Sequence, residues 1–217
     1  MANLVKMKTA MVYGASGLVG ESLVRLLLGH SAYSKITILV RKKISLNHEK
    51  LVQLIVDFDN PDPELVFGEE IYCCLGTTIK KAGSKPAFYK VDHDYVIDIA
   101  RLARSNGVQK FAFVSSMGAD ANSSIFYSKT KGETEADLVK IGFESLFIFR
   151  PSLLLGDRKE RRIGELVGKW FMTNLAFLVP TRYKPIEANQ VAKGMVQMMN
   201  SQKAGIHVLE SQEIAAM

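Results

Sequence analysis

Short apolar runs alternate with longer amphipathic segments along most of this chain. Six runs rich in Val, Ile and Phe are predicted strands, at residues 9–13, 35–40, 51–58, 71–75, 110–115 and 145–149. Three segments between them repeat apolar residues at steps of three and four and are predicted helices, at residues 18–28, 88–105 and 127–141. Gly29, Gly107 and Gly142 stand where these helices are expected to end.

Strands that are apolar on both faces and separated by helices indicate a parallel sheet with helices on both sides. The predicted fold class is therefore α/β, a doubly wound, Rossmann-like parallel sheet whose ligand site lies at the carboxyl ends of the strands. After Pro151 an amphipathic stretch at residues 164–178 contains Trp170, and a helix at 188–199 and a strand at 206–209 follow. We expect one domain, residues 1–217, in which a short C-terminal extension at residues 151–205 forms a small lobe on the substrate side.

The segment between the first strand and the first helix places glycines at positions 14, 17 and 20. Without a Cβ the backbone can turn tightly and let a diphosphate approach it. The helix that begins near Leu18 then directs free N–H groups and the positive end of its dipole at that anion. The spacing is G-x-x-G-x-x-G and not the commoner G-x-G-x-x-G. It predicts the phosphate-binding turn of a dinucleotide site; an ordinary strand-to-helix connection is the alternative.

A second candidate feature is the Tyr-Ser-Lys-Thr-Lys segment that opens a predicted helix. On a helix, Tyr127 and Lys131 lie one turn apart on the same face. A nearby ammonium favours the charged form of a phenol, which makes Tyr127 a candidate proton donor or acceptor. The preceding strand ends in Ser115-Ser116, whose hydroxyls could hold a substrate carbonyl; the spacing does not decide between them, and we favour Ser116, one residue nearer the crevice. A solvated Tyr–Lys pair is the alternative.

Composition narrows the choice of ligand and compartment. The 217 residues are 47% hydrophobic and 23% charged, the balance of an ordinary globular protein. The formal charge of +6 suits an anionic ligand, and because the basic residues form no long block we expect a nucleotide and neither nucleic acid nor a membrane. No secretory signal or membrane-spanning run is recognised, and adjacent Cys73 and Cys74 are expected to be core residues in a reducing cytoplasm. The histidines lack ligand spacing, so no metal site is expected.

The glycine turn, the serine pair and the Tyr-x-x-x-Lys helix together resemble the atypical, NAD(P)-binding kind of short-chain dehydrogenase/reductase. Further phrases resemble the branch that contains the Tat-interacting-protein oxidoreductases. They are Cys-Cys-Leu-Gly-Thr-Thr at 73–78, Val-Asp-His-Asp-Tyr-Val at 91–96, Ser-Ser-Met-Gly-Ala-Asp at 115–120, Lys-Gly-Glu at 131–133, and Phe-Arg-Pro at 149–151 with Asp157-Arg158. The resemblance extends from Lys8 to Glu210.

The resemblance implies which residues hold the cofactor. Arg41 and Lys42 stand where the adenosine ribose arrives, and because a base there pairs with a 2′-phosphate, NADP(H) is expected in preference to NAD(H). An exposed strand end is the alternative for this pair. Asp57 is implied to lie beside the adenine, and Lys131 to hydrogen-bond the nicotinamide ribose. In full, the implied cofactor-binding residues are Gly14, Ser16, Gly17, Leu18, Val19, Gly20, Arg41, Lys42, Asp57, Leu75, Gly76, Tyr127, Lys131, Leu154 and Arg162.

The leading hypothesis is an NADP(H)-dependent oxidoreductase of the short-chain dehydrogenase type. Hydride would move between the nicotinamide and a carbonyl or alcohol carbon of a small-molecule substrate that the sequence does not identify. Tyr127 would exchange the proton, Lys131 would tune it and Ser116 would position the oxygen. Two alternatives stay open: an NADP(H)-sensing regulatory protein without turnover, and a nucleotide-sugar epimerase that retains NAD. A second copy of the chain, as a homodimer, or a regulatory protein is a candidate partner.

Overall fold

The computed structural model describes residues 7–156 and 180–217. Its strands are β1 (Lys8–Tyr13), β2 (Tyr33–Val40), β3 (Leu51–Ile55), β4 (Glu70–Cys73), β5 (Lys110–Val114), β6 (Ser145–Arg150), β7 (Leu154–Leu155), β8 (Ile186–Glu187) and β9 (Gly205–Glu210). Its α-helices are α1 (Leu18–Gly29), α2 (Ile79–Ala82), α3 (Lys85–Tyr89), α4 (Tyr95–Ser105), α5 (Phe126–Ile141), α7 (Ala188–Met199) and α8 (Ser211–Ala215). A π-helical turn covers Lys90–Asp94, and 3-10 turns cover Pro63–Leu65 and Thr181–Tyr183. The stretch predicted at 164–178, with Trp170, lies outside the described residues.

Seven strands form one sheet in the order β3-β2-β1-β4-β5-β6-β9. Every neighbouring pair in it is parallel. The chain runs from β1 outward to β3 and then returns to β4 on the other side of β1, so the strand order reverses between β1 and β4. Parallel strands end at the same edge of a sheet, and such a reversal opens a crevice there. The predicted doubly wound α/β fold is confirmed.

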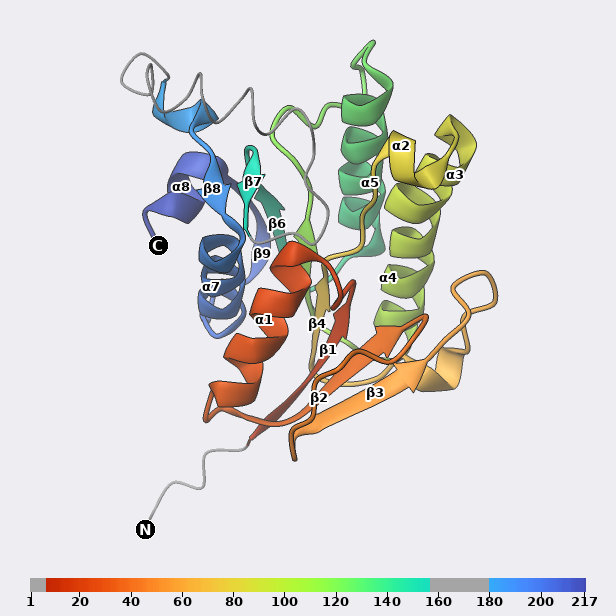
Figure 1. Ribbon diagram of the computed structural model, residues 1–217, viewed down its shortest axis with the longest axis vertical. Helices are drawn as coiled ribbons and strands as arrows, with labels where there is room; N and C mark the ends of the chain where they lie inside the picture. Colours follow the sequence, from red (N-terminus) through yellow and green to blue (C-terminus); the bar gives the residue numbers. More distant parts are fainter. Residues whose placement is uncertain (1–6, 157–179) are drawn as a thin grey trace.

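Helices cover both faces of this sheet (Figure 1). On one face α1 packs against α7, and on the other α4 packs against α5. Successive strand residues point to opposite faces. In β1, Val12 joins the core under α1 and α7, whereas Met11 and Tyr13 join the core under α4 and α5. Both faces of the sheet are therefore apolar, which explains why its strands lack a polar side.

Buried and half-buried polar side chains join the strands at their amino ends. The Tyr33 hydroxyl lies 2.6 Å from a Glu70 carboxylate oxygen and 2.8 Å from the Tyr72 hydroxyl. The Lys8 ammonium lies 2.8 Å from Glu70 and 2.9 Å from the Asn200 amide oxygen. The Asn200 amide in turn donates to the Tyr33 hydroxyl at 3.0 Å. We call these five residues the amino-edge cluster; it connects β1, β2 and β4 to the end of α7.

Some element boundaries differ from the predictions. β3 ends at Ile55 and not at residue 58, because the Asp57 carboxylate accepts a hydrogen bond from the Asp59 N–H at 2.9 Å and forms a turn. β4 begins at Glu70 and ends at Cys73, whereas residues 71–75 were expected. The predicted helix at 88–105 consists of α3, the π-helical turn and α4. The two-stranded β7–β8 sheet and α8 were not predicted, because β7 and β8 have two residues each and the five residues of α8 are too few for a helical repeat.

Candidate functional site

The glycine turn after β1 is built from close backbone approaches. Gly14 has a φ of 76°, in the left-handed region, and a Cβ there would lie 2.3 Å from the Cys74 carbonyl oxygen. A Cβ on Gly20 would lie 2.1 Å from the carbonyl oxygen of Gly14. The turn closes through a hydrogen bond from the Gly17 N–H to the Gly14 carbonyl at 3.0 Å. Gly17 caps α1 without a side-chain hydrogen bond, so the first N–H groups of the helix stay available to an anion.

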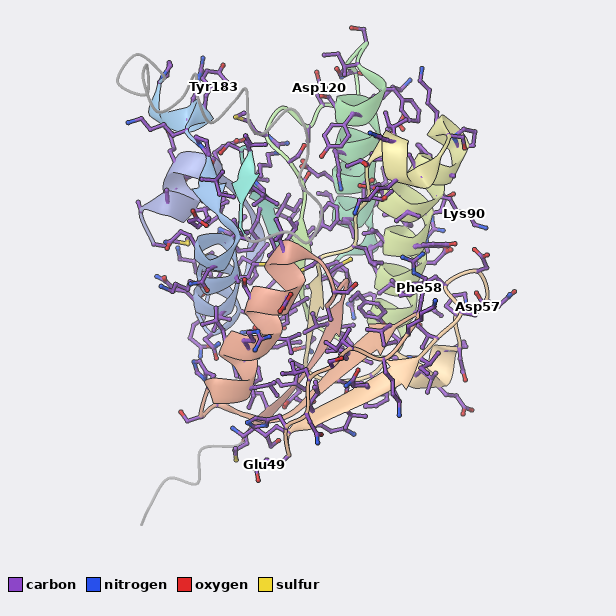
Figure 2. All side chains as sticks on the ribbon, viewed as in Figure 1. Glu49, Asp57, Phe58, Lys90, Asp120 and Tyr183 are labelled. Carbon is purple, nitrogen blue, oxygen red and sulfur yellow. The ribbon has the colours of Figure 1, made fainter. Side chains whose placement is uncertain are left out.

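The residues after β2 and β3 lie at one end of the crevice. Arg41 and Lys42 are exposed directly after β2, and neither makes an ion pair with the part of the chain that the structure describes. Asp57 is exposed after β3, and its carboxylate also accepts from the Asn60 side-chain amide at 2.9 Å. The Asp57 side chain therefore binds its own loop. Phe58 in that loop packs on Tyr95, and Figure 2 shows Asp57 and Phe58 on the α4 side of the molecule.

The centre of the crevice holds a buried ion pair. Lys131, on α5, has 4% of its side chain exposed, and its ammonium lies 2.7 Å from the Asp92 carboxylate, whose side chain is 1% exposed. The ammonium also lies 5.3 Å from the centre of the Phe113 ring. Gly76 is exposed beside this pair, and a Cβ there would lie 3.3 Å from Asp92 Oδ1 and 3.6 Å from Lys131 Nζ. The glycine therefore leaves open space next to the ammonium, and Leu75 packs below it in the α4–α5 core.

Burial and charge act in opposite directions on Lys131. Burial alone lowers the pKa of an ammonium, because the charged form loses its hydration. The Asp92 carboxylate and then the Tyr127 phenol outweigh burial and raise the pKa of Lys131 above its ordinary value. Lys131 is therefore a fixed positive charge at neutral pH.

Tyr127 lies in the first turn of α5, one turn before Lys131. Its ring packs at 5.5 Å from the ring of Phe88, which is fully buried on α3. Phe126 packs on the same Phe88 ring at 5.9 Å. The start of α5 is at the same end of the molecule as the carboxyl ends of the strands (Figure 1). The structure thus places the phenol and the ammonium on one helix at the crevice, as the sequence spacing predicted.

The two serines after β5 have different environments. Ser115 is buried, and its hydroxyl makes a short hydrogen bond to the Glu135 carboxylate. The same carboxylate binds Arg150 through contacts of 2.6, 3.0 and 3.2 Å. Ser116 is half-buried, and its hydroxyl has one long contact, 3.4 Å to the Met117 carbonyl. The Ser115 hydroxyl is occupied by the buried Glu135–Arg150 pair, whereas the Ser116 hydroxyl is free to bind a ligand.

The loop between β5 and α5 packs directly on α5. A Cβ on Gly132 would lie 2.1 Å from the Ala121 backbone nitrogen, so only glycine fits at this crossing. The Asp120 N–H donates to the Ser128 carbonyl at 3.1 Å, and Figure 2 shows Asp120 beside the start of α5. The glycine of the Lys-Gly-Glu phrase thus fixes the serine loop against the helix that carries Tyr127 and Lys131.

The remaining predicted contacts lie after β6. Leu154 is half-buried in β7 and packs against the α1–α7 core. A Cβ on the next glycine, Gly156, would lie 3.1 Å from the Leu18 side chain, so this strand passes close to the start of α1. Arg162 lies outside the described residues.

Cys73 and Cys74 pack in the two cores on either side of the sheet. Cys73 and Cys74 are free thiols. Burial raises the pKa of Cys73 to about 12, and that of Cys74 well above its usual range. Among residues 7–156 and 180–217, no group of three or more His, Cys, Asp or Glu side chains could hold a metal ion. In the same residues no helix is long and apolar enough to cross a membrane.

The sequence analysis missed three charged residues of this region: Asp92, Glu135 and Arg150. Asp92 is part of the Val-Asp-His-Asp phrase, and its position inside an otherwise apolar helical face was a signal that it is buried. Glu135 follows Lys131 by one helical turn and so shares its face. Arg150 ends β6, where a buried strand meets the crevice edge.

Comparison with known proteins gives the family. The NAD dependent epimerase/dehydratase family matches residues 10–137 of the chain. Protein HTATIP2 of Rattus norvegicus is 37% identical over 216 residues, which cover 93% of this chain and 89% of that protein. Protein FMP52, mitochondrial, of Candida albicans is 35% identical over 195 residues, which cover 84% of this chain and 83% of that protein. The predicted resemblance to the Tat-interacting-protein branch is confirmed.

Solved structures show the same fold at low identity. A UDP-N-acetylglucosamine 4-epimerase from Methanobrevibacter ruminantium superposes with a TM-score of 0.72 at 18% identity, covering 94% of this chain and 77% of that one. A UDP-glucuronic acid 4-epimerase from Bacillus cereus, in complex with UDP-glucuronic acid and NAD, gives 0.72 at 15% identity, covering 93% and 77%. The fold, the glycine turn and the sequence matches agree, and the chain belongs to the NAD dependent epimerase/dehydratase family, with a Rossmann-like, NAD(P)-binding fold.

Proposed function

We propose that the chain is an NADP(H)-dependent oxidoreductase that acts on a carbonyl or alcohol substrate through Ser116, Tyr127 and Lys131. The observation that supports it best is the charged Lys131 ammonium, buried at the carboxyl edge of the sheet on the same helix as Tyr127. An ammonium fixed one turn from a phenol favours proton exchange by that phenol.

The residues present fit a dinucleotide. Gly17 caps α1 without a side-chain hydrogen bond, so the first N–H groups of the helix are available to the diphosphate, and Gly76 places no side chain beside Lys131, where the nicotinamide ribose would lie. Residues 14–20 would hold the diphosphate, and Gly76 and Lys131 would line the nicotinamide half. The bound nicotinamide supplies or accepts the hydride. Leu154 and Arg162 are proposed as further contacts.

Each side chain of the proposed set has one task. Ser116 donates its hydroxyl hydrogen to the substrate oxygen and holds it near Tyr127. Tyr127 gives its phenolic proton to that oxygen when a carbonyl is reduced, and takes it back when an alcohol is oxidised. Lys131 stabilises the phenolate that remains, because its ammonium stays charged. Phe88, packed on the Tyr127 ring, limits the movement of the phenol.

The proposal is tested by replacing the phenol. Tyr127→Phe should lower kcat for NADPH oxidation by about 10²–10⁴-fold across a panel of aldehydes and ketones. Tyr89→Phe is the matched control, because that hydroxyl faces Glu133 and lies outside the proposed set. NADPH binding, followed by thermal shift, should persist in both variants. Unchanged turnover in Tyr127→Phe would refute the assignment.

We propose NADP(H) as the preferred cofactor because Arg41 and Lys42 are exposed after β2 without ion-pair partners in the described chain. They would pair with the 2′-phosphate, and Asp57, held by its own loop, would approach the adenine through backbone only. Calorimetric titration should show the double variant Arg41→Ala/Lys42→Ala losing NADPH affinity by about tenfold or more, with NADH affinity unchanged. Equal losses for both cofactors would contradict the preference.

A nucleotide-sugar epimerase is the second candidate, because the solved structures of similar fold include epimerases with bound NAD and UDP-sugars. Mass spectrometry of the nucleotide released from purified protein separates the two: retained NAD together with interconversion of UDP-sugars favours the epimerase. If NADPH binds but no carbonyl or UDP-sugar is converted, a sensing role remains. The two free thiols favour a reducing compartment, either the cytoplasm or the mitochondrion after which the fungal relatives are named.

A further inference from the structure

Asp92 is the counter-charge of Lys131, and three contacts from separate elements hold it in place. One carboxylate oxygen lies 2.7 Å from the Lys131 ammonium. The other accepts a hydrogen bond from the Thr77 N–H at 2.8 Å. The Thr134 hydroxyl, from α5, lies 3.0 Å from the Asp92 backbone carbonyl and 2.8 Å from the Thr130 carbonyl, and its one hydrogen is shared between these two acceptors. Asp92 is thus fixed by a strand-end loop on one side and by the helix that carries Lys131 on the other.

A π-helical turn sets the direction of Asp92. Residues 90–94 form this turn between α3 and α4. The extra residue of a π turn rotates the side chains that follow, and such turns occur often at functional sites. His93, the next residue, lies 2.8 Å from Asp94 and 3.1 Å from Asp137 of α5, which fastens the turn to the helix. Asp92 is the one buried residue of this turn, while its neighbours Val91 and His93 are half-buried.

The pair leaves donor capacity on Lys131. An ammonium has three N–H donors. Within the described chain, the Asp92 carboxylate is the only ion-pair partner of the Lys131 ammonium, and its Oδ1 accepts no other hydrogen bond; the Phe113 ring covers another side of the ammonium. Gly76, which is exposed, places no side chain beside the ammonium, since a Cβ there would lie 3.6 Å from Lys131 Nζ. Besides Asp92, the titratable groups that act on Lys131 are Tyr127 of its own helix and Cys73 of β4.

We propose that Asp92 is a positioning residue: it keeps Lys131 charged in a buried site and holds the free N–H donors of its ammonium toward the open space at Gly76. Without Asp92, burial would favour the neutral amine, which neither stabilises a phenolate nor donates as strongly to a ribose hydroxyl. The kinetic consequence rests on the proposed oxidoreductase function, whereas the ionisation of Lys131 does not.

The direct test follows the titration of Lys131 by NMR of protein with ¹³C-labelled lysine side chains. The Lys131 signal is assigned by its loss in Lys131→Arg. In Asp92→Asn, which keeps the shape and the acceptor for Thr77, the Lys131 titration should move to lower pH than in the wild type. Asp92→Glu should restore the wild-type direction, and Asp94→Asn, in the same turn but away from Lys131, should leave the titration unchanged.

A second variant keeps the test decisive if Asp92→Asn does not fold. Thr134→Val removes the hydrogen bond to the Asp92 carbonyl without changing either charge, and it should shift the titration in the same direction by a smaller amount. In kinetic assays, kcat of both proteins is compared between neutral pH and about pH 9. Over this range kcat of Asp92→Asn should fall about tenfold further than kcat of the wild type. If Lys131 titrates alike in the wild type and in the folded variants, the proposal is wrong. If the titration moves but no variant turns over any substrate, the oxidoreductase function fails and the positioning role stands.

Discussion

Charged side chains are buried both at the amino edge of the sheet, where the strands begin, and at the carboxyl edge, where they end. The two sets of charges differ in how many partners they have. In the amino-edge cluster, Lys8, Tyr33, Glu70, Tyr72 and Asn200 satisfy one another through contacts of 2.6–3.0 Å. At the carboxyl edge, by contrast, the buried ammonium has a single carboxylate partner and faces an open glycine.

The difference shows how a buried charge can serve structure or chemistry. Buried polar groups that are fully paired stabilise one arrangement and have nothing left to offer a ligand. A buried charge with free donors is less favourable for folding, but it is ready to bind a partner from solution. We therefore expect variants of the amino edge to change stability alone, and variants of the carboxyl edge to change ligand binding and turnover as well.

The largest effect is expected from Lys131→Met. It leaves the Asp92 carboxylate buried without a partner, which costs about 3–5 kcal/mol of unfolding free energy. Urea denaturation measures this loss. Lys129→Met is the matched control on the same helix, since the Lys129 side chain is 51% exposed and its removal should change stability by about 0.5 kcal/mol or less. Adding Asp92→Asn to Lys131→Met should recover much of the stability but none of the activity; recovered turnover would contradict the assigned role of Lys131.

A smaller loss is expected from Glu70→Ala in the amino-edge cluster. The variant leaves the Lys8 ammonium and the Tyr33 and Tyr72 hydroxyls without their shared acceptor, for a loss of about 3 kcal/mol. NADPH affinity at low temperature, where the variant is folded, should equal that of the wild type. A changed dissociation constant for NADPH would show that the two edges are coupled, and would contradict the expectation that amino-edge variants change stability alone.

The two serines provide a test of the same contrast within the carboxyl edge. Ser115→Ala removes a hydrogen bond to the buried Glu135 carboxylate and should lower stability by about 1–3 kcal/mol, with little effect on kcat. Ser116→Ala should leave stability within about 0.5 kcal/mol and lower kcat. Chemical denaturation and steady-state kinetics on both variants decide the assignment, which is reversed if Ser115→Ala is the variant that loses turnover.

The smallest effect is the pH dependence of the buried pair. Because the folded-state pKa of Lys131 is raised, its contribution to stability is complete below the ordinary lysine value of about 10.4 and is lost as pH rises through the folded-state value. Stability differences between the wild type and Lys131→Met, measured by urea denaturation, should be constant from about pH 7 to pH 9 and shrink only at higher pH. A difference that already shrinks near neutral pH would mean that Asp92 does not protect the charge.

Sequence reasoning predicted the central part of the fold and the placement of Tyr127 and Lys131 on one helix. Alternating apolar runs and amphipathic segments identified the first six strands of the sheet, because burial on both faces leaves a continuous apolar run. The glycine turn and the Tyr127–Lys131 spacing are local, since one turn of helix or one strand-to-helix connection fixes them. The site prediction lacked Asp92, Glu135 and Arg150, whose partners are distant in sequence.

By itself the sequence determined the doubly wound architecture, the glycine turn and the family, because these depend on local periodicity and on residues such as Gly14, whose left-handed backbone conformation favours glycine. The tertiary structure alone decided which buried charged groups have all their hydrogen-bonding atoms paired and which keep donors free for a ligand. Asp92 reaches Lys131 only because a π turn directs it inward and α5 packs against that turn. Contacts of this kind depend on how separate elements pack, and no local pattern in the chain records that packing.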